Sequence, residues 1–187
     1  MLGNRGVLVD DERRIVRAWQ VRRWIACRLE FRGLRRELMR PRRWTELFFL
    51  DEAAAFAAGH RPCAACRYPN YKHFRTLWLA CHGGAGKADD IDARLHADRL
   101  LDRATKRTYR RRLADLPDGA YVVIEGTCGL VWGERFFAWS DAGYVSWRPR
   151  PANALVDVLT PRAVVAVLEA GYLPEIHPSA ATAKRSA

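Results

Sequence analysis

Two cysteines separated by two residues, Cys63 and Cys66, form the pattern with the clearest chemical meaning in this sequence. Pro62 precedes them and predicts the start of a helix, in whose first turn the two thiols lie on one face. The positive end of a helix dipole lowers the pKa of a thiol and so favours the thiolate, which is the form that binds metal ions. The pair therefore predicts a metal site at a helix N-terminus.

The residues before the cysteines are typical of a strand followed by a short helix. Residues 47–50 form a short apolar run, and Asp51 is a suitable N-cap for a helix over residues 53–58. Gly59 can end that helix in the left-handed conformation. We expect this strand and helix to position the cysteine pair.

This stretch resembles the zinc-binding module at the N-terminus of the Ada methylphosphotriester-DNA repair proteins. In that family, a strand and a short helix lead into Ala-Ala-Gly-aromatic-Arg-Pro-Cys-x-x-Cys. Here the ending is Ala-Ala-Gly-His-Arg-Pro-Cys-Ala-Ala-Cys over residues 57–66, and the likeness covers residues 24–67, about a quarter of the chain. The family has two further cysteines upstream, four residues apart, where this chain has only Cys27. The resemblance implies a zinc ion held by Cys27, Cys63 and Cys66.

The motif leaves the fourth metal ligand open. His96 is one candidate, because a helix over residues 88–104 places it four residues after Asp92, whose carboxylate can orient a metal-binding imidazole. The alternative is a surface histidine paired with Asp92. His60 takes the place of an aromatic residue in the family's pattern, so the resemblance assigns it to packing. If His96 is the fourth ligand, the metal ion has no open position, which favours a structural site. If only the three cysteines bind, one position on the ion stays open for water or substrate.

The chain is strongly basic, with a net charge of +11 at pH 7. Lysine occurs only at positions 72, 87, 106 and 184, so 28 of the 32 basic residues are arginine (32 − 4). Arginine binds phosphate through two N–H groups at once and stacks on bases. We expect a polyanionic partner, most simply nucleic acid, with DNA favoured over RNA. The alternative is a GC-rich genome, which raises arginine content through codon usage.

The arginines gather in two places. Residues 1–50 hold 13 arginines against six acidic residues, a net charge of +7 (13 − 6). Residues 105–112 form the most basic short run, whose side chains can contact backbone phosphates. The residues assigned to nucleic-acid binding are Arg35, Arg36, Lys106, Arg107, Arg110, Arg111 and Arg112.

The hydrophobic pattern predicts an α+β protein. A hairpin over residues 6–20 and a third strand ending near Gly33 form a small N-terminal sheet, and two central helices follow the cysteine motif. After a turn at residues 116–119 the period changes to two, which predicts a β-meander and then a helix over residues 162–170. The expected domains are a metal-binding and helical domain over residues 1–115, a β-rich domain over 116–178 and a disordered tail over 179–187.

The composition of the sequence also indicates the cellular compartment. No apolar run approaches the length of about 18 residues that a membrane span needs, and the sequence does not begin with a basic and then apolar leader. Five cysteines, an odd number, fit reduced thiols better than a disulfide framework. We expect a cytoplasmic protein with no membrane partner.

These observations favour a zinc-containing protein that binds nucleic acid and acts on or repairs DNA, with zinc mainly structural. Three alternatives stay open. Zinc nucleobase deaminases also have a Pro-Cys-x-x-Cys motif, but their His/Cys-x-Glu motif differs from Cys27 and Glu30, which two residues separate. The second alternative is a stoichiometric methyl acceptor that uses the Cys27 thiolate. The third is a glycosylase or nuclease whose acid or base lies outside the cysteines.

Overall fold

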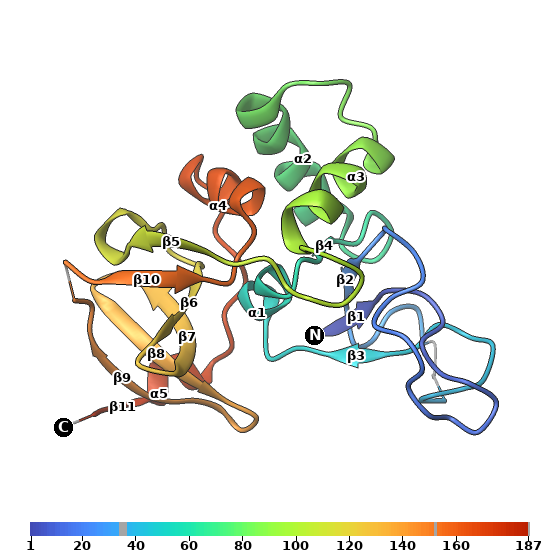
Figure 1. Ribbon diagram of the computed structural model, residues 1–187, viewed down its shortest axis with the longest axis horizontal. Helices are drawn as coiled ribbons and strands as arrows, with labels where there is room; N and C mark the ends of the chain where they lie inside the picture. The colour runs from blue at the N-terminus through green and yellow to red at the C-terminus, as the bar shows by residue number, and fades with distance from the viewer. Residues whose placement is uncertain (34–36, 152, 187) are drawn as a thin grey trace.

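The computed structural model describes residues 1–33, 37–151 and 153–186 and combines two β-sheets with helices (Figure 1). One sheet has four strands and comes from the N-terminal third of the chain, and the other has seven strands. The helix α1 (Glu52–Ala57) lies between the two sheets in Figure 1. The predicted α+β class is confirmed.

The small sheet brings the segments that carry the cysteines together. Its order is β3-β1-β2-β4, in which β1 pairs antiparallel with β2 and β3, and β2 pairs parallel with β4. The pairing of β2 with β4 continues one residue further, because the N–H of Cys63 donates to the carbonyl of Ala26 at 3.0 Å. The strands are β1 (Leu2–Asn4), β2 (Ile25–Cys27), β3 (Leu47–Phe48) and β4 (Arg61–Pro62).

The predicted N-terminal strands are wrong in extent. Residues 6–20 form no hairpin of regular strands and contribute one isolated bridge, between Val9 and Ile15. The strand expected to end near Gly33 ends at Cys27. A strand needs a buried face to fix its register, and residues 11–18 are all exposed, so their alternating pattern has no core to face.

Two helices flank the cysteine motif, each with a well-defined end. In α1 the carboxylate of Asp51 accepts from the N–H of Ala54 at 2.8 Å, and Gly59 follows the helix with a φ of 85°. The helix α2 (Tyr68–His82) ends at Gly83, which also has a positive φ. Gly tolerates this conformation because it lacks a Cβ.

The prediction that Pro62 opens a helix carrying both cysteines in its first turn is wrong. Arg61 and Pro62 form β4 at the edge of the small sheet, and the chain then turns before α2 begins at Tyr68. An edge strand tolerates proline because one side of it needs no N–H donor. Sheet pairing with β2 therefore takes the place of the helical turn.

The helices form one apolar core that draws on both ends of the chain. α3 (Ala88–Arg99) and α4 (Arg162–Glu169) pack against each other, and α4 also packs against α2 (Figure 1). Buried side chains of this core include Phe74 of α2, Leu95 of α3 and Val164 of α4. The core therefore crosses the boundary expected at residues 115 and 116.

The seven-stranded sheet contains the predicted meander. Strands β6 to β9 are joined by consecutive antiparallel pairings, and β10 and β5 extend the sheet on one side. α1 packs on this sheet through Ala53 and Ala57, which contact the cluster around Tyr121 and Leu130. The strands are β5 (Tyr109–Arg112), β6 (Tyr121–Ile124), β7 (Thr127–Trp132), β8 (Arg135–Ser140), β9 (Gly143–Pro149), β10 (Leu155–Val158) and β11 (Lys184–Arg185), and a 3-10 helix (Leu113–Asp115) follows β5.

The expectation of a disordered tail is wrong for residues 179–186. A short helix α5 (Ser179–Thr182) precedes β11, which pairs in parallel with β9. The hydroxyl of Ser179 accepts from the N–H of Tyr144 at 2.9 Å, and the N–H of Ser186 donates to the carbonyl of Trp147. Small and polar residues give little sign of such pairing in sequence.

Across the described ranges, no helix combines the length and apolar character needed to span a membrane.

Three cations satisfy the carbonyls at the C-terminal end of α1. Lys106 donates to the carbonyl of Ala57 at 2.5 Å, Arg5 to that of Ala58 at 3.4 Å and Arg99 to that of Gly59 at 2.9 Å. Cations stabilise this end of a helix because its dipole is negative there. The three side chains come from distant parts of the sequence, so α1 holds these parts together.

His60 follows directly and is fully buried. Its ring lies 4.7 Å from the ring of Phe49 and 5.4 Å from that of Trp24, centroid to centroid, which confirms its assignment to packing. Burial, and then the charges of Arg5 and Arg99, hold the pKa of His60 well below its usual value. The imidazole is therefore neutral in the folded protein.

We predict that His60→Phe makes the stability less sensitive to acid. As the pH falls below about 6.5, His60 of the unfolded chain takes up a proton that the folded chain does not, so the wild type loses up to about 1.4 kcal/mol per pH unit from this residue. Phenylalanine packs in the same place and removes this loss. Urea unfolding between about pH 7.5 and 5.5 measures it, with the exposed His73→Gln as a control that should follow the wild type. Parallel pH profiles for wild type and His60→Phe would contradict the prediction.

Candidate metal centre

Three cysteines converge at one end of the small sheet. The Sγ atoms of Cys27, Cys63 and Cys66 all lie within 4.8 Å of one another. Cys27 is the last residue of β2, Cys63 directly follows β4, and Cys66 lies in the turn before α2. All three are free thiols, of which Cys27 and Cys63 are buried and Cys66 is half-buried. Three thiols at this separation can hold a metal ion.

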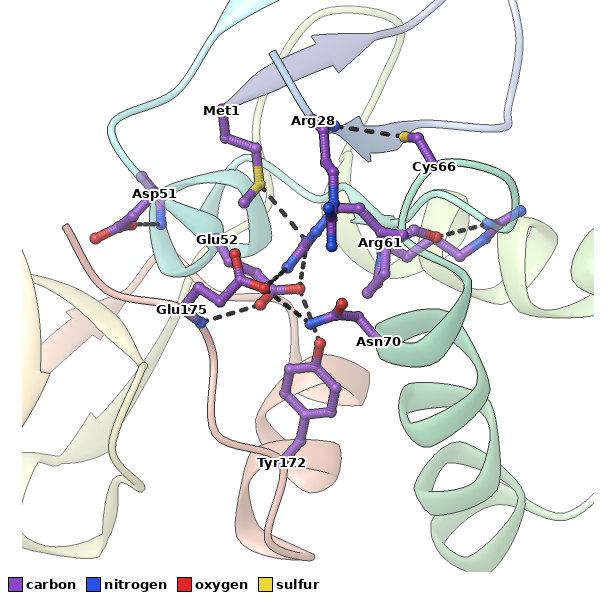
Figure 2. Close-up of polar contacts among 12 residues, drawn as sticks. Met1, Arg28, Asp51, Glu52, Arg61, Cys66, Asn70, Tyr172 and Glu175 are labelled. Atoms are coloured by element: carbon purple, nitrogen blue, oxygen red, sulfur yellow. Dashed lines mark hydrogen bonds and ion pairs between the residues drawn. The ribbon is translucent and has the colours of Figure 1, made fainter. Parts of the chain in front are cut away.

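Backbone N–H groups point at two of the sulfurs. The N–H of Ala65 donates to Cys63 Sγ, and the N–H of Arg28 donates to Cys66 Sγ, each with an N···S distance of 3.4 Å (Figure 2 draws the second). Such bonds stabilise a thiolate relative to a thiol and orient metal ligands. The N–H···S bonds therefore favour a metal-binding role for the cluster over a chance contact between cysteines that only pack in the core.

Cys27 and Cys63 do not hold their protons equally. A hydrogen bond from Cys27, together with the N–H of Ala65, lowers the pKa of Cys63 to about 5. Donating that hydrogen bond, and burial, raise the pKa of Cys27. Cys63 is therefore the thiolate of the metal-free cluster, and binding of a metal must release the proton of Cys27.

A buried ion pair fixes the chain just before Cys63. The guanidinium of Arg61 donates to both oxygens of Asp92, on α3, at 2.8 and 2.7 Å. Both side chains are at most 3% exposed. Burial raises the pKa of Asp92, and the charge of Arg61 opposes that rise. The pair ties β4 to the helical core.

A second buried ion pair fixes the chain just after Cys66. Arg67 Nη1 donates to Glu52 Oε1 at 2.6 Å, and both side chains are at most 1% exposed. Glu52 also accepts from the hydroxyl of Tyr172 at 2.8 Å and from the N–H of Glu175 at 3.0 Å. Figure 2 shows Tyr172 and Glu175 meeting at the Glu52 carboxylate. The cysteine turn is thus held at both ends by arginines whose partners come from α3 and α1.

We predict that Asp92→Asn strongly destabilises the protein. The substitution keeps the shape of the side chain but leaves the buried Arg61 charge without a counter-charge, which costs about 3–5 kcal/mol. Removing the carboxylate of Glu52 would be a weaker test, because Arg67 would keep a second carboxylate partner, Glu175, which lies 2.9 Å from its Nη2. Urea unfolding at pH 7 measures the change.

Asp11→Asn is the matched control for Asp92→Asn. Asp11 pairs with Arg42 at the surface, where both side chains are more than half exposed, and water and salt screen such a pair, so its loss should change stability little. Equal losses in the two variants would show that the buried pair has no special role.

The structure does not bring His96 into the cysteine group. Within residues 1–33, 37–151 and 153–186, the cysteines are joined by no fourth His, Cys, Asp or Glu donor. The ring of His96 packs edge-on against Trp19 at 4.5 Å, and its Nδ1 lies 3.0 Å from Nη2 of Arg99. The alternative pairing of His96 with Asp92 is not found among the described residues, where Arg61 donates to both oxygens of that carboxylate and His96 lies against Arg99.

The residues predicted to bind nucleic acid differ in their surroundings. Burial lowers the pKa of Lys106 to about 8, and its amine points inward at α1. Arg111 pairs with Glu169 at 2.6 Å. The exposed members of the set are Arg107, Arg110 and Arg112, whereas Arg35 and Arg36 lie outside the described residues.

Sequence reasoning missed the carboxylates that hold the cysteine turn and a pocket beside it. A surface pocket of about 370 Å³ opens next to Cys27 and is bordered by Arg28, Arg67, Glu175 and His177. A signal for the ion pairs was present in the sequence, since Glu52, Arg61 and Arg67 are charged residues within a motif that is mostly apolar. The spacing of residues along the sequence does not indicate which side chains Glu52, Arg61 and Arg67 pair with.

The comparisons with known proteins add no family to this description. None of the protein-family models, curated proteins or solved structures compared with the chain matches it. The likeness to the Ada zinc module therefore remains an expectation from residues 24–67.

Proposed function

We propose that this protein is a zinc-thiolate protein that binds nucleic acid and acts on or repairs DNA, with a mainly structural zinc ion. The observation that carries the proposal is the convergence of Cys27, Cys63 and Cys66 within 4.8 Å. Thiolates favour soft or borderline ions such as Zn²⁺, whereas Mg²⁺ and Ca²⁺ prefer oxygen ligands. Zn–S bonds of about 2.3 Å in a tetrahedral site put sulfurs roughly 3.8 Å apart, which the cluster can accommodate.

A structural role fits the elements that meet at the cysteines. β2 has three residues and β4 has two, so their hydrogen bonds alone form a marginal sheet. An ion held by Cys27, Cys63 and Cys66 joins β2 to the turn that leads into α2. Zinc therefore supplies a cross-link where the apolar core is thin.

Surface charge supports the nucleic-acid part of the proposal. Seven arginines take part in the ion pairs of the described residues. Of the 28 arginines, 26 lie in the described part of the chain, so 19 of them (26 − 7) have no carboxylate partner there. Some of these 19 donate to backbone carbonyls inside the protein, as Arg5 and Arg99 do, and the exposed ones among the rest are available to bind backbone phosphates.

A reactive zinc centre is the second candidate, and the count of donors favours it. Three sulfurs leave one position of a tetrahedral ion for solvent or substrate, and Cys27 borders the pocket of about 370 Å³. In this candidate the protein is a nucleic-acid-modifying enzyme or a stoichiometric methyl acceptor. Observation of hydrolysis or methyl uptake that depends on Cys27 would favour this reactive candidate over the structural one.

We predict one zinc per chain in protein purified without chelators. Cys63→Ser should lose the metal and lower the thermal stability, because a remaining pair of thiolates binds zinc weakly. Cys81→Ser is the control, since Cys81 is an exposed cysteine on α2 outside the cluster. Elemental analysis and thermal unfolding, with and without a chelator, measure both effects. Full stability with no bound metal would exclude the zinc proposal, and a zinc-loaded protein that binds neither DNA nor RNA at low salt would exclude its nucleic-acid part.

A further inference from the structure

Three arginines from separate elements surround a surface pocket far from the cysteines in sequence. The pocket has a volume of about 550 Å³ and is bordered by Arg94 of α3, Arg107 before β5 and Arg162 at the start of α4. All three side chains are exposed. We call this site the arginine pocket. It forms where α3 packs against α4, so it depends on the folded core.

The arginine pocket has unbalanced positive charge. Among the described residues, neither Arg94, Arg107 nor Arg162 has an ion-pair partner within 4.0 Å. Asp98 is the one carboxylate that borders the pocket, and its Oδ2 accepts from the N–H of Ala163 at 2.7 Å. The positive end of the α4 dipole therefore already opposes part of the charge of Asp98.

The surroundings of the pocket are ordered by contacts within the protein. The guanidinium of Arg162 lies 3.8 Å from the ring centre of Tyr109, which holds its plane while leaving the N–H groups at its edge free to donate. His82 Nε2 lies 2.9 Å from the carbonyl of Ala163, so it donates there. The ring of His82 also packs against Trp78 at 4.5 Å.

We propose that the arginine pocket binds phosphate groups of a nucleic-acid backbone. This inference rests on the proposed function and names the surface that carries it. Arginines bind phosphate oxygens through paired N–H groups, and three of them can contact successive phosphates of one strand. Among the described residues that border the pocket, only His82 has an aromatic ring, and this half-buried ring packs against Trp78 and donates to the carbonyl of Ala163. The pocket therefore presents guanidinium groups rather than a stacking surface. Binding is therefore independent of base sequence.

The test compares two triple variants with the same loss of charge. The pocket variant is Arg94→Gln, Arg107→Gln and Arg162→Gln. The control variant is Arg13→Gln, Arg14→Gln and Arg42→Gln, which removes three exposed arginines that already pair with carboxylates. Fluorescence anisotropy with labelled single-stranded and duplex DNA and RNA, between about 50 and 200 mM salt, measures affinity and its salt dependence.

The pocket variant should bind roughly tenfold or more weakly than the wild type, and its slope of log K against log salt should fall by about 0.7–0.9 for each phosphate that the variant no longer neutralises. The control should stay within about threefold. Two duplexes of equal composition and different sequence should bind alike. If the triple variant does not fold, Arg94→Gln alone, on the exposed face of α3, is compared with Arg13→Gln alone, so that the loss of charge again matches.

The possible failures are distinguishable. Wild-type affinity in the pocket variant, or an equal weakening in the control, would overturn the arginine pocket while leaving nucleic-acid binding in place. A wild-type protein that binds no DNA or RNA at low salt would overturn the proposed function and this inference with it.

Discussion

The buried pairing of Arg61 with Asp92 and of Arg67 with Glu52 is the constraint on which the geometry of the cysteine cluster depends. An arginine removed from water needs a carboxylate in good geometry, since the cost of burying an unpaired charge is several kcal/mol. Here each pair spans elements that are distant in sequence, and the two arginines bracket Cys63 and Cys66. The turn that presents these sulfurs to Cys27 is therefore fixed by charge as well as by the pairing of β2 with β4.

The same constraint extends through α1 to the rest of the fold. At the N-terminal end of this helix, Asp51 accepts from the hydroxyl of Tyr144 at 2.6 Å and from the N–H of His177 at 3.1 Å. Glu52 binds Arg67 and the segment after α4. The C-terminal end of α1 is held by three cations. A helix of six residues thus connects the cysteine cluster, the helical core and the seven-stranded sheet.

Local signals in the sequence were sufficient for much of the fold. The cap at Asp51 and the glycine at position 59 predicted the ends of α1, and a period of two predicted the meander. Long-range choices could not be predicted in this way. The spacing that suggested a pair between Asp92 and His96 is local, but the carboxylate binds Arg61, 31 residues away, because a planar guanidinium contacts both of its oxygens. Pro62 likewise suggested a helix start, whereas in the fold β2 provides it with a partner strand.

The cysteines of the candidate site were predicted from their types and from a resemblance, whereas the groups that hold and surround them were not. A Cys-x-x-Cys pair in a sequence indicates metal binding. The third donor, the N–H···S bonds and the pocket depend on the tertiary fold and could not be predicted from that pair. X-ray absorption at the zinc edge of the purified protein identifies the atoms that hold the ion. We expect three sulfur ligands at about 2.3 Å and one nitrogen or oxygen ligand at about 2.0–2.1 Å. A coordination shell of nitrogen and oxygen alone would contradict this expectation.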